Sequence, residues 1–122
     1  MTFSCKPARL AIYVNTARKT AAQIKSETGC TALINGGLFN MADFSPACHL
    51  KVDGKVLIAD KYTYWGYGWT GDGFPALVSD YAAMANYIAC VCLVRNAKAE
   101  PLYYSAAMGG ARPRTAFGTF AD

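Results

Sequence analysis

The stretch that decides the expected fold covers residues 47–59 and has the sequence ACHLKVDGKVLIA. Two apolar-rich runs, Ala47–Val52 and Lys55–Ala59, flank the dipeptide Asp53-Gly54. An Asp-Gly pair between two such runs is the strongest short-range indication of a β-hairpin, because these residues tolerate the positive φ of a tight turn. The sequence therefore predicts a β-hairpin whose turn lies at residues 53–54.

Upstream of the hairpin, the pattern is typical of a strand, a helix and a second strand. Leu10–Val14 is apolar and β-branched, and Cys30–Ile34 resembles it as a second buried strand. Between them, Asn15 or Thr16 is suited to cap a helix over about residues 17–28. The spacing predicts a βαβ crossover, although no Rossmann glycine pattern accompanies it.

Downstream, strands dominate the expected structure. We expect a short helix at Tyr81–Asn86, a long central strand at Tyr87–Arg95 and a turn at Asn96–Ala99. Two further strands are predicted at Leu102–Ser105 and Arg114–Phe120. The predicted class is α+β, with one main helix, a mixed β-sheet and the hairpin. Residues 1–122 are expected to form one small domain at most, or part of a larger one.

Composition excludes several classes of protein. The 122 residues are 53% hydrophobic and 16% charged, a balance that excludes intrinsic disorder. The longest apolar run, Tyr87–Val94, is far shorter than the roughly 18 residues of a membrane span, so we expect no membrane association. Met1–Pro7 lacks the apolar stretch of a signal peptide. The net charge of +4 comes from basic residues spread along the chain, so nucleic-acid binding is not expected.

The cysteines do not form a metal-binding pattern. No C-x-x-C pair is present and the chain has a single histidine, so neither a metal nor another cofactor is expected. Cys90 and Cys92 lie in an apolar run and are expected to be small buried side chains on one strand. We predict no intrachain disulfide among the five thiols, which favours a reducing compartment without identifying it. The five are Cys5, Cys30, Cys48, Cys90 and Cys92.

Two loops carry groups suited to binding an anion or a sugar. Asn35-Gly36-Gly37 follows a predicted buried strand, so its backbone N–H groups and the Asn35 amide could face a ligand; the alternative is a simple tight turn. Arg112-Pro113-Arg114-Thr115 places two guanidinium groups and a hydroxyl at the start of a predicted strand, a set suited to phosphate oxygens. Its alternative is a pair of solvated arginines.

The remaining candidates have ordinary structural explanations beside the functional ones. His49 is either a partly buried polar residue of the hairpin or a catalytic acid or ligand-binding group. It does not form a dyad with Cys48, because neighbours on a strand point to opposite faces. Asp53 is first of all a turn former, and Asp43 and Asp72 are loop acids with no stronger functional indication.

Three motifs in order give the chain a resemblance to a known family. Residues 32–40, ALINGGLFN, match an N-G-G-x-F motif. Residues 49–56, HLKVDGKV, match the hairpin that follows it, and residues 112–118, RPRTAFG, match an R-x-R-T-A-x-G strand. From about Leu10 to Asp122, the chain resembles the phosphodiester glycosidases, which are related to the enzyme that removes N-acetylglucosamine from a phosphodiester and so uncovers mannose 6-phosphate.

The resemblance implies hydrolysis of a glycosyl phosphodiester. Arginines would stabilise the charge of the departing phosphate. Arg114 and Asn35 are then expected to be catalytic, and their side chains should share one cleft. The residues expected to bind substrate are Gly36, Gly37, Phe39, His49, Arg112 and Thr115.

The chain also departs from the family pattern. The family continues past the R-T-A-x-G strand to an Asp-Gly-Gly-Gly-Ser-Ser motif, which is not found in these 122 residues. We therefore expect the N-terminal half of a larger domain, inactive alone, whose catalytic carboxylate comes from a missing C-terminal half or a second copy. The alternatives are a non-catalytic binding module for a phosphorylated or acidic glycan, and a structural half-domain that pairs with another chain.

Overall fold

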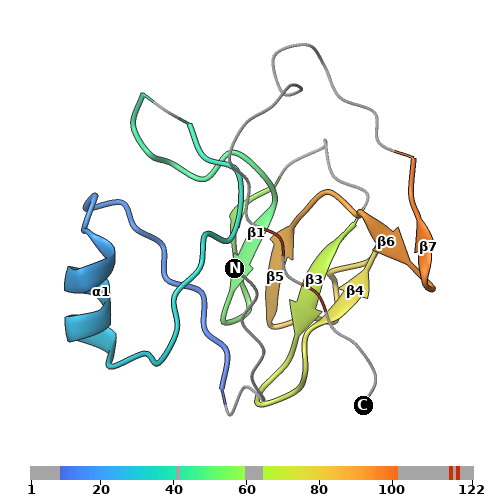
Figure 1. Ribbon diagram of the computed structural model, residues 1–122, viewed down its shortest axis with the longest axis horizontal. Coiled ribbons are helices and arrows are strands. Elements are labelled where there is room, and N and C mark those ends of the chain that lie inside the picture. The colour runs from blue at the N-terminus through green and yellow to red at the C-terminus, as the bar shows by residue number, and fades with distance from the viewer. Residues whose placement is uncertain (1–8, 41, 60–64, 102–115, 117, 119–122) are drawn as a thin grey trace.

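The computed structural model describes residues 9–40, 42–59, 65–101, 116 and 118. Within these residues it has one helix and two antiparallel sheets, which confirms the α+β class (Figure 1). The elements are α1 (Ala21–Thr28), β1 (Leu50–Val52), β2 (Lys55–Ile58), β3 (Gly66–Trp69), β4 (Ala76–Val78), β5 (Asn86–Ala89), β6 (Val94–Arg95) and β7 (Lys98–Ala99).

The larger sheet has the strand order β2-β1-β5-β3-β4, so β5 is its central strand. Leu50 pairs with Ile88 on one side of β5, and Tyr67 pairs with Ile88 on the other. Every pairing in the described residues is antiparallel, so the sheet that we see is not the mixed sheet that the strand–helix–strand pattern predicted.

The predicted hairpin is confirmed. β1 and β2 are joined at Asp53 and Gly54, which have φ values of 47° and 82°. Two positive φ values match the twist of the flanking strands, as expected for an Asp-Gly turn. The Gly54 N–H also donates to the Ala85 carbonyl at 2.7 Å, which ties the turn to the chain just before β5.

Alternation along the strands gives the larger sheet two distinct faces. Asn86 and Ile88 point to one side, which we call the Ile88 face. Tyr87 and Ala89 point to the other, the Tyr87 face, where a Cβ atom on Gly66 would lie 2.4 Å from the Tyr87 ring. Tyr87 is 1% exposed and is the largest fully buried side chain of the described residues.

Helix α1 begins at Ala21, four residues later than the predicted start at 17. Asn15 does not cap the helix but closes a turn before it. Its side chain accepts a hydrogen bond from the Lys19 N–H and donates one to the Lys19 carbonyl, both at 2.8 Å. Arg18 has a φ of 54°, which a helix cannot include. Thr20 is the actual N-cap, in a capping box with Gln23.

The two strands predicted around the helix are absent from the described residues. Among the described residues, Leu10–Val14 and Cys30–Ile34 pair with no strand and form no βαβ crossover. Leu33 and Ile34 are 42% and 57% exposed, so this apolar run is not buried as a sheet strand would be. Both segments run between α1 and the larger sheet in Figure 1.

Two other elements differ from the sequence prediction. Tyr81–Asn86 contains a turn at residues 82–83 rather than a helix, and the central strand begins at Asn86. This strand ends at Ala89 instead of reaching Arg95, which belongs to the separate β6–β7 hairpin. The strands predicted at Leu102–Ser105 and Arg114–Phe120 lie outside the described residues, apart from positions 116 and 118.

Candidate functional site

The Asn35-Gly36-Gly37 loop lies against the central strand on the Ile88 face. A Cβ atom on Gly36 would approach Ile88 Cδ1 to 2.6 Å, and one on Gly37 would lie 3.6 Å from the same atom. Position 36 therefore has no room for a side chain unless the loop or Ile88 moves. Asn35 itself is exposed, so its amide is accessible at the surface.

Phe39, the aromatic residue of the N-G-G-x-F motif, belongs to an exposed aromatic pair. Its backbone forms an isolated bridge with Pro46, and its ring stacks on Phe44 with centroids 5.5 Å apart. The Arg18 guanidinium lies 4.7 Å from the centre of the Phe44 ring. Phe39 remains 46% exposed, which leaves part of its ring free to contact a ligand.

His49 lies on the Tyr87 face, on the opposite side of the sheet from the glycine loop. Its ring centroid is 3.9 Å from that of Tyr81 and 5.4 Å from that of Tyr87. His49 directly precedes β1, and only 2% of it is exposed, so its ring is buried against these two tyrosines. Burial is also the main reason that the pKa of Tyr87 is raised above its ordinary value.

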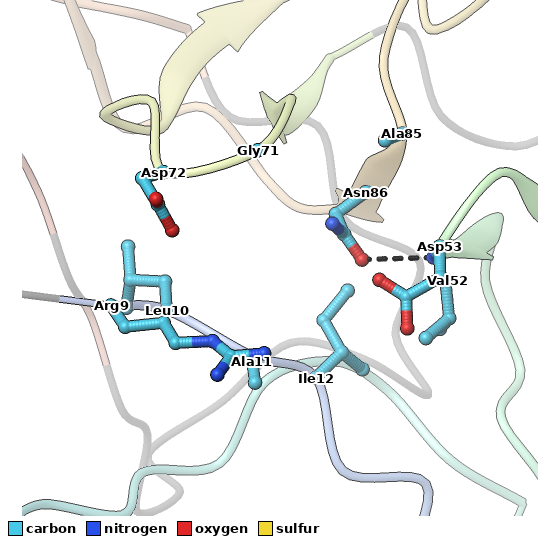
Figure 2. A pocket seen from close by; sticks show the side chains of 10 residues that line it. All are labelled: Arg9, Leu10, Ala11, Ile12, Val52, Asp53, Gly71, Asp72, Ala85 and Asn86. Atoms are coloured by element: carbon cyan, nitrogen blue, oxygen red, sulfur yellow. Dashed lines mark hydrogen bonds between the residues drawn. The ribbon is translucent and has the colours of Figure 1, made fainter.

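A pocket opens on the Ile88 face, at the end of β5 where Asn86 lies (Figure 2). Its volume is about 210 Å³. One wall is the segment Arg9–Ile12, and the other comes from the ends of β1, β3 and β5 with their turns. The polar groups that line it belong to Arg9, Asp53, Asp72 and Asn86.

Asn86 is the buried polar residue of this pocket. It is 7% exposed, and its Oδ1 accepts a hydrogen bond from the Asp53 N–H at 3.1 Å. The same asparagine thus holds the hairpin turn and presents the rest of its amide to the pocket (Figure 2). The sequence pattern predicts Asn86 at the end of a short helix and gives no sign of a site there; only the pairing of Asn86 with Trp69 places it at the start of a strand.

The structure brings together part of the predicted site. The glycine loop and the Asp-Gly hairpin both meet β5, through Ile88 and through the pairing of Leu50. His49 is not part of this group. Arg112, Arg114 and Thr115 lie outside the described residues, so the expected approach of Asn35 to Arg114 stays a prediction.

The thiols of the described residues are separate from this site. Cys30, Cys48, Cys90 and Cys92 form no disulfide with one another, and Cys5 lies outside the described part of the chain. Burial raises the pKa of Cys90 to about 11, with a smaller contribution from Cys92. The prediction that Cys90 and Cys92 are buried on one strand is wrong: β5 ends before Cys90, and both residues are only half-buried.

Metal-binding and membrane-spanning features were also sought in the described residues. No group of three or more His, Cys, Asp or Glu side chains gathers there in a way that could hold a metal ion. The helix found in these residues is too short to cross a bilayer.

Comparison of the chain with protein-family models, with curated proteins and with solved structures gave no match.

Proposed function

We propose that the chain takes part in the hydrolysis of a glycosyl phosphodiester. In this reaction, water adds at the anomeric carbon and the bond from that carbon to the phosphate oxygen breaks. The products are a free sugar and the phosphomonoester of the other alcohol. The reaction class comes from the resemblance of three ordered motifs to the phosphodiester glycosidases.

One observation supports this proposal most directly. Two of the three motifs, which are separate in the sequence, meet the same central strand. Gly36 abuts Ile88 of β5, and the hairpin of the second motif pairs with β5 through Leu50 and Lys51. Motifs that serve one substrate must be close in space, and these two are.

The roles proposed for the residues follow from their chemistry. Arg114 and Arg112 would stabilise the negative charge that grows on the departing phosphate, helped by the Thr115 hydroxyl. The Asn35 amide would hold a sugar or phosphate oxygen, and the backbone N–H groups of Gly36 and Gly37, which are exposed residues, would donate to the same ligand.

The partners proposed with this activity are the sugar phosphodiester and a further protein segment. The family's later Gly-rich acidic motif would complete the site, supplied by a C-terminal half or a second copy of the chain. A carboxylate from that segment would serve as the acid or base that glycoside cleavage requires.

The test measures release of free sugar from the methyl ester of a hexose 1-phosphate. The 122-residue chain is assayed alone, over a range of concentrations, and together with any segment encoded after residue 122. Arg114→Gln should lower the rate by about 10²- to 10³-fold, as loss of transition-state charge stabilisation does elsewhere. Arg95→Gln, in the separate β6–β7 hairpin, is the matched control and should leave the rate unchanged.

The outcomes separate the candidate functions. Sugar release that depends on Arg114 supports the glycosidase proposal. The absence of release in every form of the chain would contradict it. Binding of the ester without release would instead support a glycan-binding module, which is the alternative that the same loops allow.

A further inference from the structure

We propose that the pocket at Asn86 binds a single neutral sugar ring. We call it the Asn86 pocket; its walls are Arg9–Ile12 and the ends of β1, β3 and β5. This inference rests on the proposed function, because it assigns the sugar part of the substrate to this pocket. Apart from Val52 and Asp53 of the second motif, the residues that line this pocket lie outside the three motifs.

The first reason is a buried amide that faces the pocket. Asn86 is 7% exposed, and its Oδ1 is used by the Asp53 N–H at 3.1 Å. Figure 2 shows the amide nitrogen directed away from Asp53, toward the space between Asp72 and Ile12. The amide nitrogen is a hydrogen-bond donor, so an oxygen of a bound ligand can accept a hydrogen bond from it.

The second reason is the mixture of charges around the pocket. Arg9 supplies a guanidinium on one wall, and Asp53 and Asp72 supply carboxylates on the other. Two carboxylates repel a phosphate, and the guanidinium repels a metal cation. A sugar hydroxyl both donates and accepts hydrogen bonds. A neutral polyol can therefore accept from the guanidinium and donate to the carboxylates.

The third reason is size. The volume of about 210 Å³ is smaller than the range of roughly 300–1,000 Å³ that is usual for drug-sized ligands. One pyranose ring is a suitable occupant, whereas a disaccharide would have to extend out of the pocket. The ligand class is therefore a monosaccharide unit rather than an extended glycan.

The position of the pocket relates it to the glycine loop. Asn86 and Ile88 are two residues apart on one face of β5, which corresponds to about 7 Å along the strand. Gly36 lies against Ile88. A sugar that hydrogen-bonds to Asn86 can therefore extend its anomeric substituent along the Ile88 face toward Asn35-Gly36-Gly37.

The test is a binding measurement that does not depend on turnover. Glucose and N-acetylglucosamine are titrated into the ¹⁵N-labelled 122-residue chain, with inorganic phosphate and glycine as competing ligand classes. We expect the Asn86 side-chain NH₂ signal to shift with a dissociation constant on the order of 1 mM for a sugar. A shift produced by phosphate or glycine, and not by either sugar, would overturn the assignment.

Substitutions locate the binding. Asp72→Asn and Arg9→Gln, at exposed positions, should each weaken sugar binding by about tenfold. Asn86→Asp keeps an oxygen for the Asp53 N–H but removes the donor, and should abolish binding. Asp80→Asn is the matched control: Asp80 caps Ala82 N–H in a turn away from the pocket, and an asparagine oxygen can still do so.

The two proposals fail in distinguishable ways. If sugar release occurs with an unchanged KM in Asp72→Asn and Arg9→Gln, the pocket assignment is wrong and the glycosidase proposal stands. If sugars bind through Asn86 but no form of the chain releases sugar, the pocket assignment stands and the glycosidase proposal is wrong. Should Asn86→Asp fail to fold, the two exposed substitutions still decide the result.

Discussion

Gly36 lies against Ile88, where the N-G-G loop meets the central strand of the sheet; a Cβ atom at residue 36 would fall 2.6 Å from Ile88 Cδ1. The contact involves the tip of a side chain rather than backbone. It explains why this position takes a glycine although its φ is not in the left-handed region. The requirement is for space.

Gly36→Ala should lower the free energy of unfolding by about 1 kcal/mol at most, the low end of overpacking costs, because Ile88 Cδ1 is the end of a flexible side chain and can rotate away. Gly37→Ala meets Ile88 at an ordinary contact distance of 3.6 Å and should cost less. Denaturant unfolding of both variants measures the difference. Ile88→Val removes the clashing Cδ1 atom, so the double variant should be less destabilised than the sum of the single changes. Additive effects would show that this contact is not responsible.

Gly66→Ala should be more damaging, because the new Cβ meets atoms that cannot move easily. It would lie 2.4 Å from Tyr87 Cζ and 2.6 Å from the Ile88 carbonyl oxygen. We expect a loss of about 3 kcal/mol or more, at the upper end of overpacking effects. Gly118→Ala is the control, since nothing lies within 4 Å of a Cβ there. Similar melting temperatures for the two variants would contradict the packing described for β3 against β5.

His49→Ala tests the aromatic cluster on the Tyr87 face. The substitution removes a ring that is packed against Tyr81 and Tyr87, with 2% of the residue exposed. A loss of about 2–4 kcal/mol is expected from the cavity that remains. Phe74→Ala, at a residue that is 70% exposed, should change stability by no more than about 0.5 kcal/mol. If His49 instead binds substrate, the variant should keep its stability and lose sugar binding.

Cys90 gives the protein a pH dependence in the alkaline range. Burial raises the pKa of this thiol from 9.0 to about 11, so near pH 8 its thiolate fraction is about one hundredth of that of the unfolded chain. Alkylation by iodoacetamide, followed residue by residue with mass spectrometry, should be correspondingly slower in the folded protein than in denaturant. Equal rates would show that Cys90 is not buried.

The same shift has a consequence for stability. The folded pKa of Cys90 lies above the unfolded pKa, so the folded chain holds the proton more tightly than the unfolded chain does. The contribution of Cys90 to the free energy of unfolding is therefore fully present below about pH 9, and it is lost as the pH rises toward 11. Denaturant unfolding measured between pH 9 and 11 should show that Cys90→Ala lacks this decrease in the free energy of unfolding. Cys30→Ala should retain the decrease.

Some features were predictable from local sequence. The Asp53-Gly54 turn was predicted because few residue pairs accept two successive positive φ values. The helix was predicted from the apolar spacing that buries Ile24, but its start was not, because Asn15 can cap either a helix or an isolated turn. Local preference alone did not decide between these two uses of the same side chain.

The candidate site was predictable only in part, for a related reason. The glycine loop was visible in the sequence as a break after an apolar run. The burial of Asn86 was not, because it depends on pairing with Trp69 and on the Asp53 N–H, both distant in sequence. His49 was recognised as a candidate, but its separation from the loop follows from which face of the sheet it occupies.

Composition and the conformational preferences of adjacent residues were enough to predict the sheet-rich class, the hairpin at residues 53–54 and the three ordered motifs. Contacts between distant parts of the chain place β5 at the centre of the described sheet, leave Leu10–Val14 and Cys30–Ile34 outside that sheet, and bring Gly36 against Ile88. An apolar, β-branched run favours burial and extended backbone, but the strand that it pairs with is set by contacts far along the chain.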